Sequence, residues 1–183
     1  MIADVEVPRV YLAYHAPRWN EPGSMALAAA AAVLAGHRAA RLTRALVHER
    51  RIAQECVALK WQEIEDAGLF LAIVTGKPGV DVDRLIQAYD EEVARLAAEG
   101  PDEEETAAAR NLVGLGLVER LADIGGRADA LAHAAVMLDD PAFVERQQRE
   151  IGELDGDLIR EAAGRWLGPG RGIVAYVPRG RDG

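Results

Sequence analysis

Histidine is the residue most often used to bind a catalytic metal, and this sequence contains four: His15, His37, His48 and His133. Zinc-dependent hydrolases commonly place two histidines on one face of a helix, with a glutamate beside them that activates water. Here no two histidines are close enough for that arrangement, and Glu49 follows His48 without a second histidine at helical spacing. The sequence also lacks paired cysteines, G-x-S-x-G and G-x-x-x-x-G-K-[ST]. We therefore predict that this chain has no catalytic residues, metal ligands or cofactor of its own.

Two other features could carry chemistry, but each has a plainer explanation. Cys56, the single cysteine, lies in a stretch that alternates like a strand, so we favour a buried unreactive thiol over a nucleophile. The acidic run 102–105 could bind a metal or a basic partner. It directly follows Pro101, however, and carboxylates in the first turn of a helix interact favourably with its free N–H groups and dipole. We favour this helix-start interpretation.

The composition is that of an ordinary globular protein. Of 183 residues, 50% are hydrophobic, 28% are charged and 5% are aromatic, so we expect a core of aliphatic side chains and closely packed, alanine-rich helices. The net charge of -9 argues against a nucleic-acid partner, because phosphate contacts need clustered lysines and arginines. We find no signal-peptide pattern and no run of transmembrane length. We expect a single domain, residues 1–183, located in the cytoplasm.

One stretch organises the remaining chain. Residues 39–51 carry a narrow apolar stripe among basic residues, which predicts a short helix. Residues 57–61 then alternate between apolar and polar types, as in a strand with one buried face, and residues 66–68 have turn chemistry. The pattern predicts a helix, a strand and a turn in succession.

The turn leads into an unbroken apolar run over residues 69–75. Such a run with β-branched residues is typical of a central strand that is covered on both faces. We therefore predict that Leu71 and Ile73 are almost fully buried.

Periodicity and end signals predict the other elements. Strands are expected over 9–15 and 172–177, and helices over 24–34, 81–99, 101–124, 127–138, 141–150 and 155–167. In the helix 127–138, Leu131, Ala135 and Leu138 recur on one face, which we expect to point inward. Four strands with helices in clusters, rather than strict alternation, predict a two-layer α+β sandwich.

Several motifs, taken together and in this order, resemble the second half of pitrilysin/insulinase-family metallopeptidases. In that family the pattern includes L-G-G-G, S-R-L, L-V/R-x-E and D-x-G-L-F. The corresponding segments here are Leu34-Ala35-Gly36, Arg41-Leu42, Leu46-Val47-His48-Glu49, Ala53, Asp66-Ala67-Gly68-Leu69-Phe70, Gly100 to Glu105, Asp140-Pro141 and Trp166 to Pro169. No single motif is specific, but the collinear set spans nearly the whole chain.

The resemblance implies a fold and a role. The fold would be a mostly antiparallel sheet with helices on one face, as in the C-terminal, non-zinc-binding domain of these processing-peptidase-like enzymes (inverzincins). Family members place two such domains, on one chain or on two subunits, around a peptide chamber. Zinc is then bound by an H-x-x-E-H motif in the other domain. The implied partners are a zinc-bearing homologous domain, in cis or in trans, and a peptide substrate.

The resemblance also indicates substrate-binding positions. In active members the zinc-free half carries an arginine and, seven residues later, a tyrosine that reach the bound peptide. Counting from Arg41-Leu42, these positions hold Val47 and Gln54. Valine cannot donate a charge-assisted hydrogen bond, and glutamine only weakly replaces a phenol. Arg44, Arg50 and Arg51 could compensate, or they could simply form a solvated helix face.

Two hypotheses remain open at this stage. In the first, the chain is the non-catalytic half of a zinc metallopeptidase and takes part in proteolysis only when paired with an H-x-x-E-H domain. In the second, the parent protein has lost peptidase chemistry and uses the domain for structure or binding. An H-x-x-E-H motif upstream in the full-length gene would favour the first.

Overall fold

Strands from both ends and the middle of the chain assemble into one sheet. The computed structural model describes residues 1–3, 5–61 and 68–178. The strand order is β1-β5-β2-β4-β3, with β1 (Ile2–Ala3), β2 (Arg9–Ala16), β3 (Ala53–Trp61), β4 (Gly68–Gly76) and β5 (Arg171–Pro178). Only β1 and β5 run parallel, and the other neighbouring pairs are antiparallel. The two-residue strand β1 was not predicted, because so short a segment shows no alternation.

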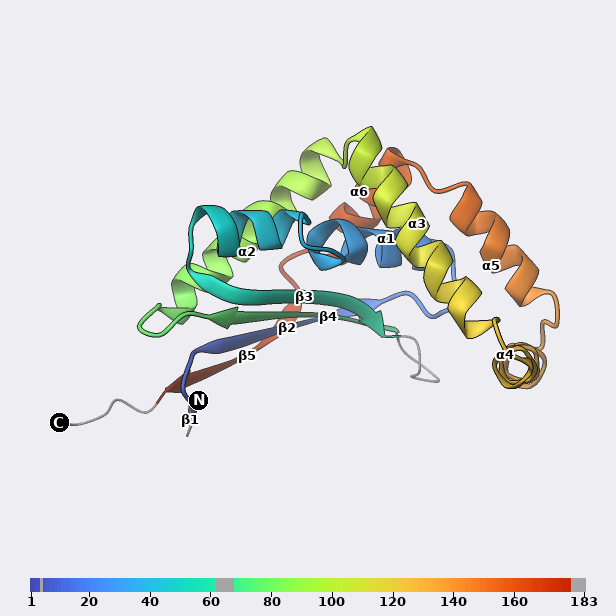
Figure 1. Ribbon diagram of the computed structural model, residues 1–183, viewed down its shortest axis with the longest axis horizontal. Coiled ribbons are helices and arrows are strands. Elements are labelled where there is room, and N and C mark those ends of the chain that lie inside the picture. The colour runs from blue at the N-terminus through green and yellow to red at the C-terminus, as the bar shows by residue number, and fades with distance from the viewer. Residues whose placement is uncertain (4, 62–67, 179–183) are drawn as a thin grey trace.

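All the helices of the described chain lie on one face of this sheet (Figure 1). They are α1 (Ser24–Ala35), the π-helical segment η1 (Thr43–Glu49), α2 (Val82–Glu99), α3 (Glu103–Arg120), α4 (Ile124–Met137), α5 (Phe143–Gly152) and α6 (Gly156–Trp166). The predicted two-layer α+β sandwich, with a mostly antiparallel sheet and helices on one face, is confirmed. In the described ranges, no helix is both long and apolar enough to cross a membrane.

Helix α1 forms the centre of the core. Ten of its twelve residues are buried, and it packs against α3, α6 and β3. Five of those ten are alanines, whose small side chains allow the neighbouring helices to approach closely. The prediction of an alanine-rich core with few aromatic residues is confirmed, and Tyr14, Tyr89, Phe70 and Phe143 are the fully buried aromatic side chains.

The prediction that Leu71 and Ile73 are almost fully buried is wrong. Both side chains are half-buried, whereas Phe70, Ala72 and Val74 on the same strand are completely inaccessible. Successive side chains of a strand point to opposite faces, and the helices cover only one face. The sequence of β4 is apolar on both faces, so it does not reveal that one of them lacks a cover within this chain.

The uncovered side of the sheet is a continuous apolar surface, which we call the open face. The strand registers place on it Tyr11, Ala13, Val57, Leu59, Trp61, Leu69, Leu71, Ile73, Val174 and Tyr176. The same registers place the exposed residues Arg9, His15 and Glu55 toward its ends. None of these side chains is buried, and Trp61 is 45% exposed. Two tyrosines on it, Tyr11 and Tyr176, meet edge to face with ring centroids 5.8 Å apart.

The start of β4 explains a glycine in the resembling motif. Asp66 and Ala67, which the sequence assigns to a turn, lie outside the described residues, but Gly68 begins the strand. A Cβ atom added to Gly68 would lie 2.2 Å from the carbonyl oxygen of Pro17. No side chain fits there, so the close approach of β2 and β4 requires glycine at this position.

Helix α4 differs most from its prediction. The expected helix over 101–124 ends at Arg120, and a new helix begins at Ile124 because the side chain of Asp123 caps it by accepting a hydrogen bond from Gly126 N. The Gly125-Gly126 pair therefore lies in the first turn of α4 and does not terminate α3.

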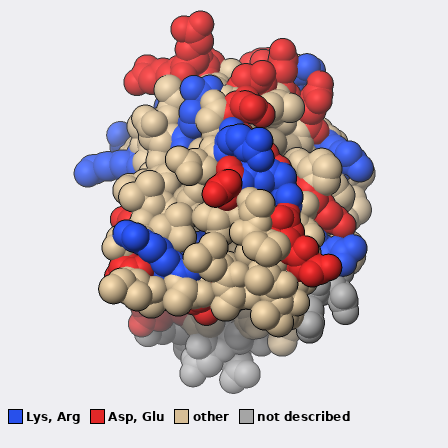
Figure 2. Space-filling model, turned by 90° about the vertical axis from the view of Figure 1, so that its right-hand side faces the viewer, with Lys and Arg blue, Asp and Glu red and all other residues tan. Residues whose placement is uncertain are grey.

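The inward face predicted for α4 is also wrong. Its buried residues are Ala130 and Ala134, while Leu131 is 51% exposed and Ala135 is exposed. The larger side chains thus point away from the core, and the smaller ones make the contact. Figure 2 looks onto this end of the molecule, where uncharged surface spreads below the charged groups.

These two faces of β4 predict different mutational costs. Phe70→Ala should lower the free energy of unfolding by about 3–5 kcal/mol, because it opens a cavity under the helices. Leu71→Ala, the neighbouring residue on the open face, should cost only about 1–2 kcal/mol. Urea unfolding of the two variants beside the parent chain measures both values. Equal costs would show that the open face is covered within the chain.

Candidate functional site

The four histidines are dispersed and do not fit a zinc site. His15, His37 and His48 are exposed, and the ring of His133 packs against Trp19 with centroids 4.9 Å apart. Within the described ranges, no group of three or more histidine, cysteine, aspartate or glutamate residues is arranged to hold a metal ion. We therefore assign no catalytic step to a metal bound by this chain.

The lone cysteine is buried, as predicted. Cys56 is 7% exposed, and its Sγ lies 3.8 Å from the carbonyl oxygen of Leu42, beneath the start of η1. Burial raises the pKa of the thiol to about 12, and the nearby Glu55 carboxylate acts in the same direction. Because the thiolate is the reactive form, Cys56 is a packing residue rather than a nucleophile.

The residues that the resemblance indicates lie where η1 passes into β3. The helix ends with the N–H of Arg50 donating to Ala45 O and the N–H of Ile52 donating to Leu46 O, each at 2.9 Å. Between them Arg51 adopts a φ of 55°, an unusual conformation for a residue with a side chain. This reversal turns the chain sharply from the helix layer into the edge strand of the sheet.

The two substituted positions lie on either side of this turn, in different environments. Val47 is half-buried and packs against the hydrophobic core. Gln54 is exposed and lies at a break in the β3–β4 register, between Ala53 and Glu55, so it has no partner residue on β4. Of the two, only Gln54 presents its side chain to the exterior.

The two nearby arginines differ in their interactions. Arg50 donates a hydrogen bond to Glu91 at 2.6 Å and lies 4.0 Å from the buried carboxylate of Glu92, so it fixes the end of η1 against α2. Arg44 is exposed and has a carboxylate, that of Glu49, only at 3.9 Å. A compensating contact with a bound peptide would therefore come from Arg44, because Arg50 is already engaged.

A buried arginine that sequence reasoning overlooked anchors this region. Arg41 is 7% exposed, and its Nε and Nη2 donate to the two oxygens of Glu105 at 2.8 and 2.6 Å. Its Nη2 also donates to the carbonyl of Gly100 at 2.7 Å. The sequence signal for Arg41 was the Arg41-Leu42 motif, which we used only as the starting point for locating positions 47 and 54.

Glu105 also belongs to the acidic run, whose helix-start interpretation is confirmed. The N–H of Glu105 donates to Asp102 Oδ1 at 2.8 Å, and the N–H of Asp102 donates to Glu105 Oε2 at 3.1 Å, forming a capping box. The first turn of α3 therefore holds Arg41, and with it the segment that leads into η1.

Comparison with known proteins identifies the family. A family model described as the peptidase M16 inactive domain matches residues 1–113. The chain belongs to this family. The match confirms the resemblance to the second, non-zinc-binding half of pitrilysin/insulinase-family metallopeptidases.

Solved structures have the same fold. One is a putative zinc protease of Bordetella pertussis Tohama I, 26% identical with a TM-score of 0.84 over 94% of each chain. Another is the inactive peptidase domain of a protein with the same description from Bordetella parapertussis, 24% identical with a TM-score of 0.88 over 100% of this chain and 97% of that one. A protease from Helicobacter pylori, 19% identical with a TM-score of 0.84, matches 95% of this chain with 42% of its own. No protein of curated function matches significantly.

The family match divides this M16 inactive domain into two parts. The matched residues contain the η1–β3 junction with Arg44, Val47, Arg50 and Gln54, as well as Arg41. The C-terminal part of α3, from residue 114 on, and all of α4, α5 and α6 follow the matched range. The positions that the resemblance indicates are therefore in the part that is typical of the family.

The second part is tied to the first by a polar cluster that the sequence did not reveal. Arg171 on β5 donates to both carboxylate oxygens of Asp90 on α2 and, at 2.9 Å, to the hydroxyl of Tyr14 on β2. The buried ring of Tyr89 lies beneath the same guanidinium. This cluster locks the last strand to the first long helix, so its role is structural.

Replacing Arg41 tests whether the η1 segment depends on its buried ion pair. Arg41→Met should destabilise the domain by about 3–5 kcal/mol, because it leaves the carboxylate of Glu105 and the carbonyl of Gly100 without their donor. Arg44→Met, one turn later and exposed, is the matched control and should change stability by less than about 0.5 kcal/mol. Chemical unfolding measures both, and equal effects would contradict the anchoring role.

The same pair predicts a pH dependence. Burial alone would raise the pKa of Glu105, but hydrogen bonds from Arg41 and from the backbone of Asp102 outweigh it and hold the pKa below its usual range. Ionised Glu105 therefore stabilises the fold above its unfolded pKa of about 4.3, and this contribution is lost as the pH falls through the lower folded value. Glu105→Gln should flatten the loss of stability below about pH 4.3.

Proposed function

We propose that this M16 inactive domain forms one wall of a peptide-binding chamber and pairs with a zinc-bearing homologous domain, in cis or in trans, for proteolysis. The observation that carries the proposal is the open face. Ten apolar side chains from four strands lie there without a covering helix from the described chain. A continuous apolar surface of this kind marks an interface with another protein surface.

In this proposal the two domains divide the chemistry. The companion domain supplies an H-x-x-E-H motif, which holds zinc and a general base. The present chain contributes the apolar open face and holds the η1–β3 junction in position. Its open face excludes water from the chamber, and its edge strand β3 has a backbone edge along which an extended peptide can form hydrogen bonds. Arg41 and Arg50 keep the η1–β3 junction in place beside that edge.

The alternative is a structural or binding module in a complex without peptidase activity. The observation that favours it is the environment of Val47 and Gln54. Val47 packs against the core and has no group to donate to a substrate oxygen. Under this alternative the open face still binds the companion domain, but the assembly does not cleave peptides.

Reconstitution tests the proposal. The chain is mixed with the H-x-x-E-H domain encoded with it, and cleavage of a fluorogenic peptide library is followed with and without a chelator. Neither half alone should cleave, the pair should, and chelation should abolish cleavage. Stoichiometric zinc in the purified chain alone would contradict the division of chemistry.

Two matched variants locate the contact. Val174→Glu places a charge on the open face, whereas Ile124→Glu places one on α4, and both side chains are exposed in the chain alone. Val174→Glu should weaken pairing by at least about tenfold, because it buries an unpaired carboxylate, and Ile124→Glu should leave pairing unchanged. Pairing without cleavage would favour the binding module, and no pairing would overturn both functions.

The substituted positions give a further test within the assembled pair. Val47→Arg with Gln54→Tyr returns a charged donor and a phenol where the resemblance places them. A well-placed donor to developing negative charge is worth a factor of about 10²–10³ in rate. Val47 lies partly in the core, so we expect a gain of about tenfold or less. Peptide turnover measures the gain, and Gln54→Phe, which lacks the hydroxyl, serves as the control. No gain would remove these positions from the substrate path.

A further inference from the structure

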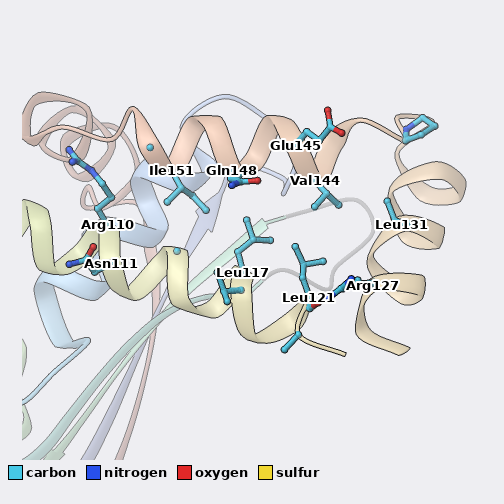
Figure 3. A pocket seen from close by; sticks show the side chains of 15 residues that line it. Arg110, Asn111, Leu117, Leu121, Arg127, Leu131, Val144, Glu145, Gln148 and Ile151 are labelled. Carbon is cyan, nitrogen blue, oxygen red and sulfur yellow. Dashed lines mark hydrogen bonds between the residues drawn. The ribbon is translucent and has the colours of Figure 1, made fainter. Parts of the chain in front are cut away.

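A groove lies on the helix side of the molecule, away from the open face. It has a volume of about 850 Å³, which falls within the range of about 300–1,000 Å³ that is usual for small-molecule sites. Helices α3 and α5 form its two long walls, and α4 closes one end (Figure 3). It lies almost wholly beyond residues 1–113, the part that the family model matches.

The walls of the groove are apolar. Leu117 and Leu121 on α3 and Val144 and Ile151 on α5 point into the space between the helices, and Leu131 on α4 closes it (Figure 3). Leu117 and Ile151 belong to the buried core and Leu121 and Val144 pack against it, whereas Leu131 is 51% exposed.

Two glycines, which have no side chain to fill the space, keep the groove open. Gly114 on α3 has only hydrogen where a Cβ would lie 3.7 Å from Ile151 Cγ2, and a Cβ at Gly152 would meet nothing within 4 Å. Helix α4 contacts its neighbours through two alanines, and its larger residue Leu131 is left facing the groove. The space is therefore built into the helix packing.

The opposite end of the groove is polar and cationic. There Arg110 donates through Nε and Nη2 to the carbonyl of Leu154, which fixes the guanidinium while Nη1 takes no part. Asn111 lies beside it on the rim. A second arginine on the lining, Arg127, stands at the α4 end, but it is exposed and its Nε donates to the carbonyl of Leu121, whereas Arg110 is half-buried. Within the described ranges, no carboxylate forms an ion pair with Arg110, and the one acidic residue on the lining, Glu145, lies toward the other end and points away from the space (Figure 3).

We propose that this groove binds a monomeric long-chain carboxylate. Its carboxylate group contacts Arg110 and Asn111, and its alkyl chain runs between α3 and α5 toward Leu131. The charge of the ligand complements a fixed, half-buried guanidinium, and its chain matches the apolar walls. Because α4 closes one end, a ligand of limited length fits better than a helix that would have to pass through. The site is separate from the open face and does not depend on the proposed peptidase role.

A series of single-chain amphiphiles tests the ligand class. Dodecanoate, dodecanol and dodecylammonium are titrated into the full chain below their critical micelle concentrations by calorimetry. We expect one dodecanoate per chain, bound at least about tenfold more tightly than the alcohol or the amine. Octanoate should bind more weakly by up to about fourfold for each methylene that it lacks.

Paired variants test where the ligand binds. Leu131→Glu and Val136→Glu change exposed apolar residues on the same helix, but only Leu131 lines the groove. Leu131→Glu should lower dodecanoate affinity at least about tenfold, and Val136→Glu should leave it within about twofold. Arg110→Gln should remove the preference for dodecanoate over dodecanol, with its folding checked by thermal unfolding.

Several results would overturn the proposal. These are the absence of saturable 1:1 binding, equal effects of Leu131→Glu and Val136→Glu, and tighter binding of the alcohol than of the carboxylate. Association with phosphatidylglycerol vesicles but not with monomeric dodecanoate would instead indicate a membrane-binding surface. A loss of peptidase pairing in Val174→Glu with dodecanoate binding intact would show that the two surfaces act independently.

Discussion

The sheet of this domain has two apolar faces, and the described helices cover only one of them. On the covered face, the alanine-rich helix α1 lies against β3 and carries α3 and α6 above it. On the other face, side chains such as Leu71, Ile73 and Val174 remain accessible. Apolar surface of this extent is costly to leave in water, so a companion that covered the open face would stabilise both partners. The membership of the chain in the M16 inactive domain family agrees with such a division of labour.

A buried ion pair sets the position of the η1–β3 junction. Arg41 joins the segment before η1 to the first turn of α3, and Arg50 joins its end to α2. The loss of either contact would let the edge of the sheet shift, since the connection to β3 is a single sharp reversal at Arg51. The anchors thus lie within the sequence that matches the family, as do Val47 and Gln54, the positions that the resemblance indicates.

The sequence predicted where the helices and strands lie better than it predicted which of their faces are covered. Periodicity located every described strand except β1, and all seven described helical segments. The acidic run at 102–105 was correctly assigned to a helix start, because caps and turns are local. The errors concern which face is covered. Leu71 and Leu131 are apolar and periodic, as buried residues are, yet their faces have no neighbour within the described chain. The anchor Arg41 was missed because its partner Glu105 is 64 positions away in the sequence.

These errors have a common physical cause that bears on function. A sequence pattern reports that a face avoids water, but the element that covers it can belong to the same chain, to another protein or to a ligand. Where the fold leaves such a face bare, the failed prediction itself locates a contact surface. The broad open face, flat and without a fixed charge at its centre, suits a second folded domain. The narrow groove between α3 and α5, with Arg110 at one end, is bounded on three sides and suits a small amphiphile instead. The two surfaces therefore differ in the partner that each can accept, because one is wide and mostly apolar and the other is confined, with the half-buried guanidinium of Arg110 at one end.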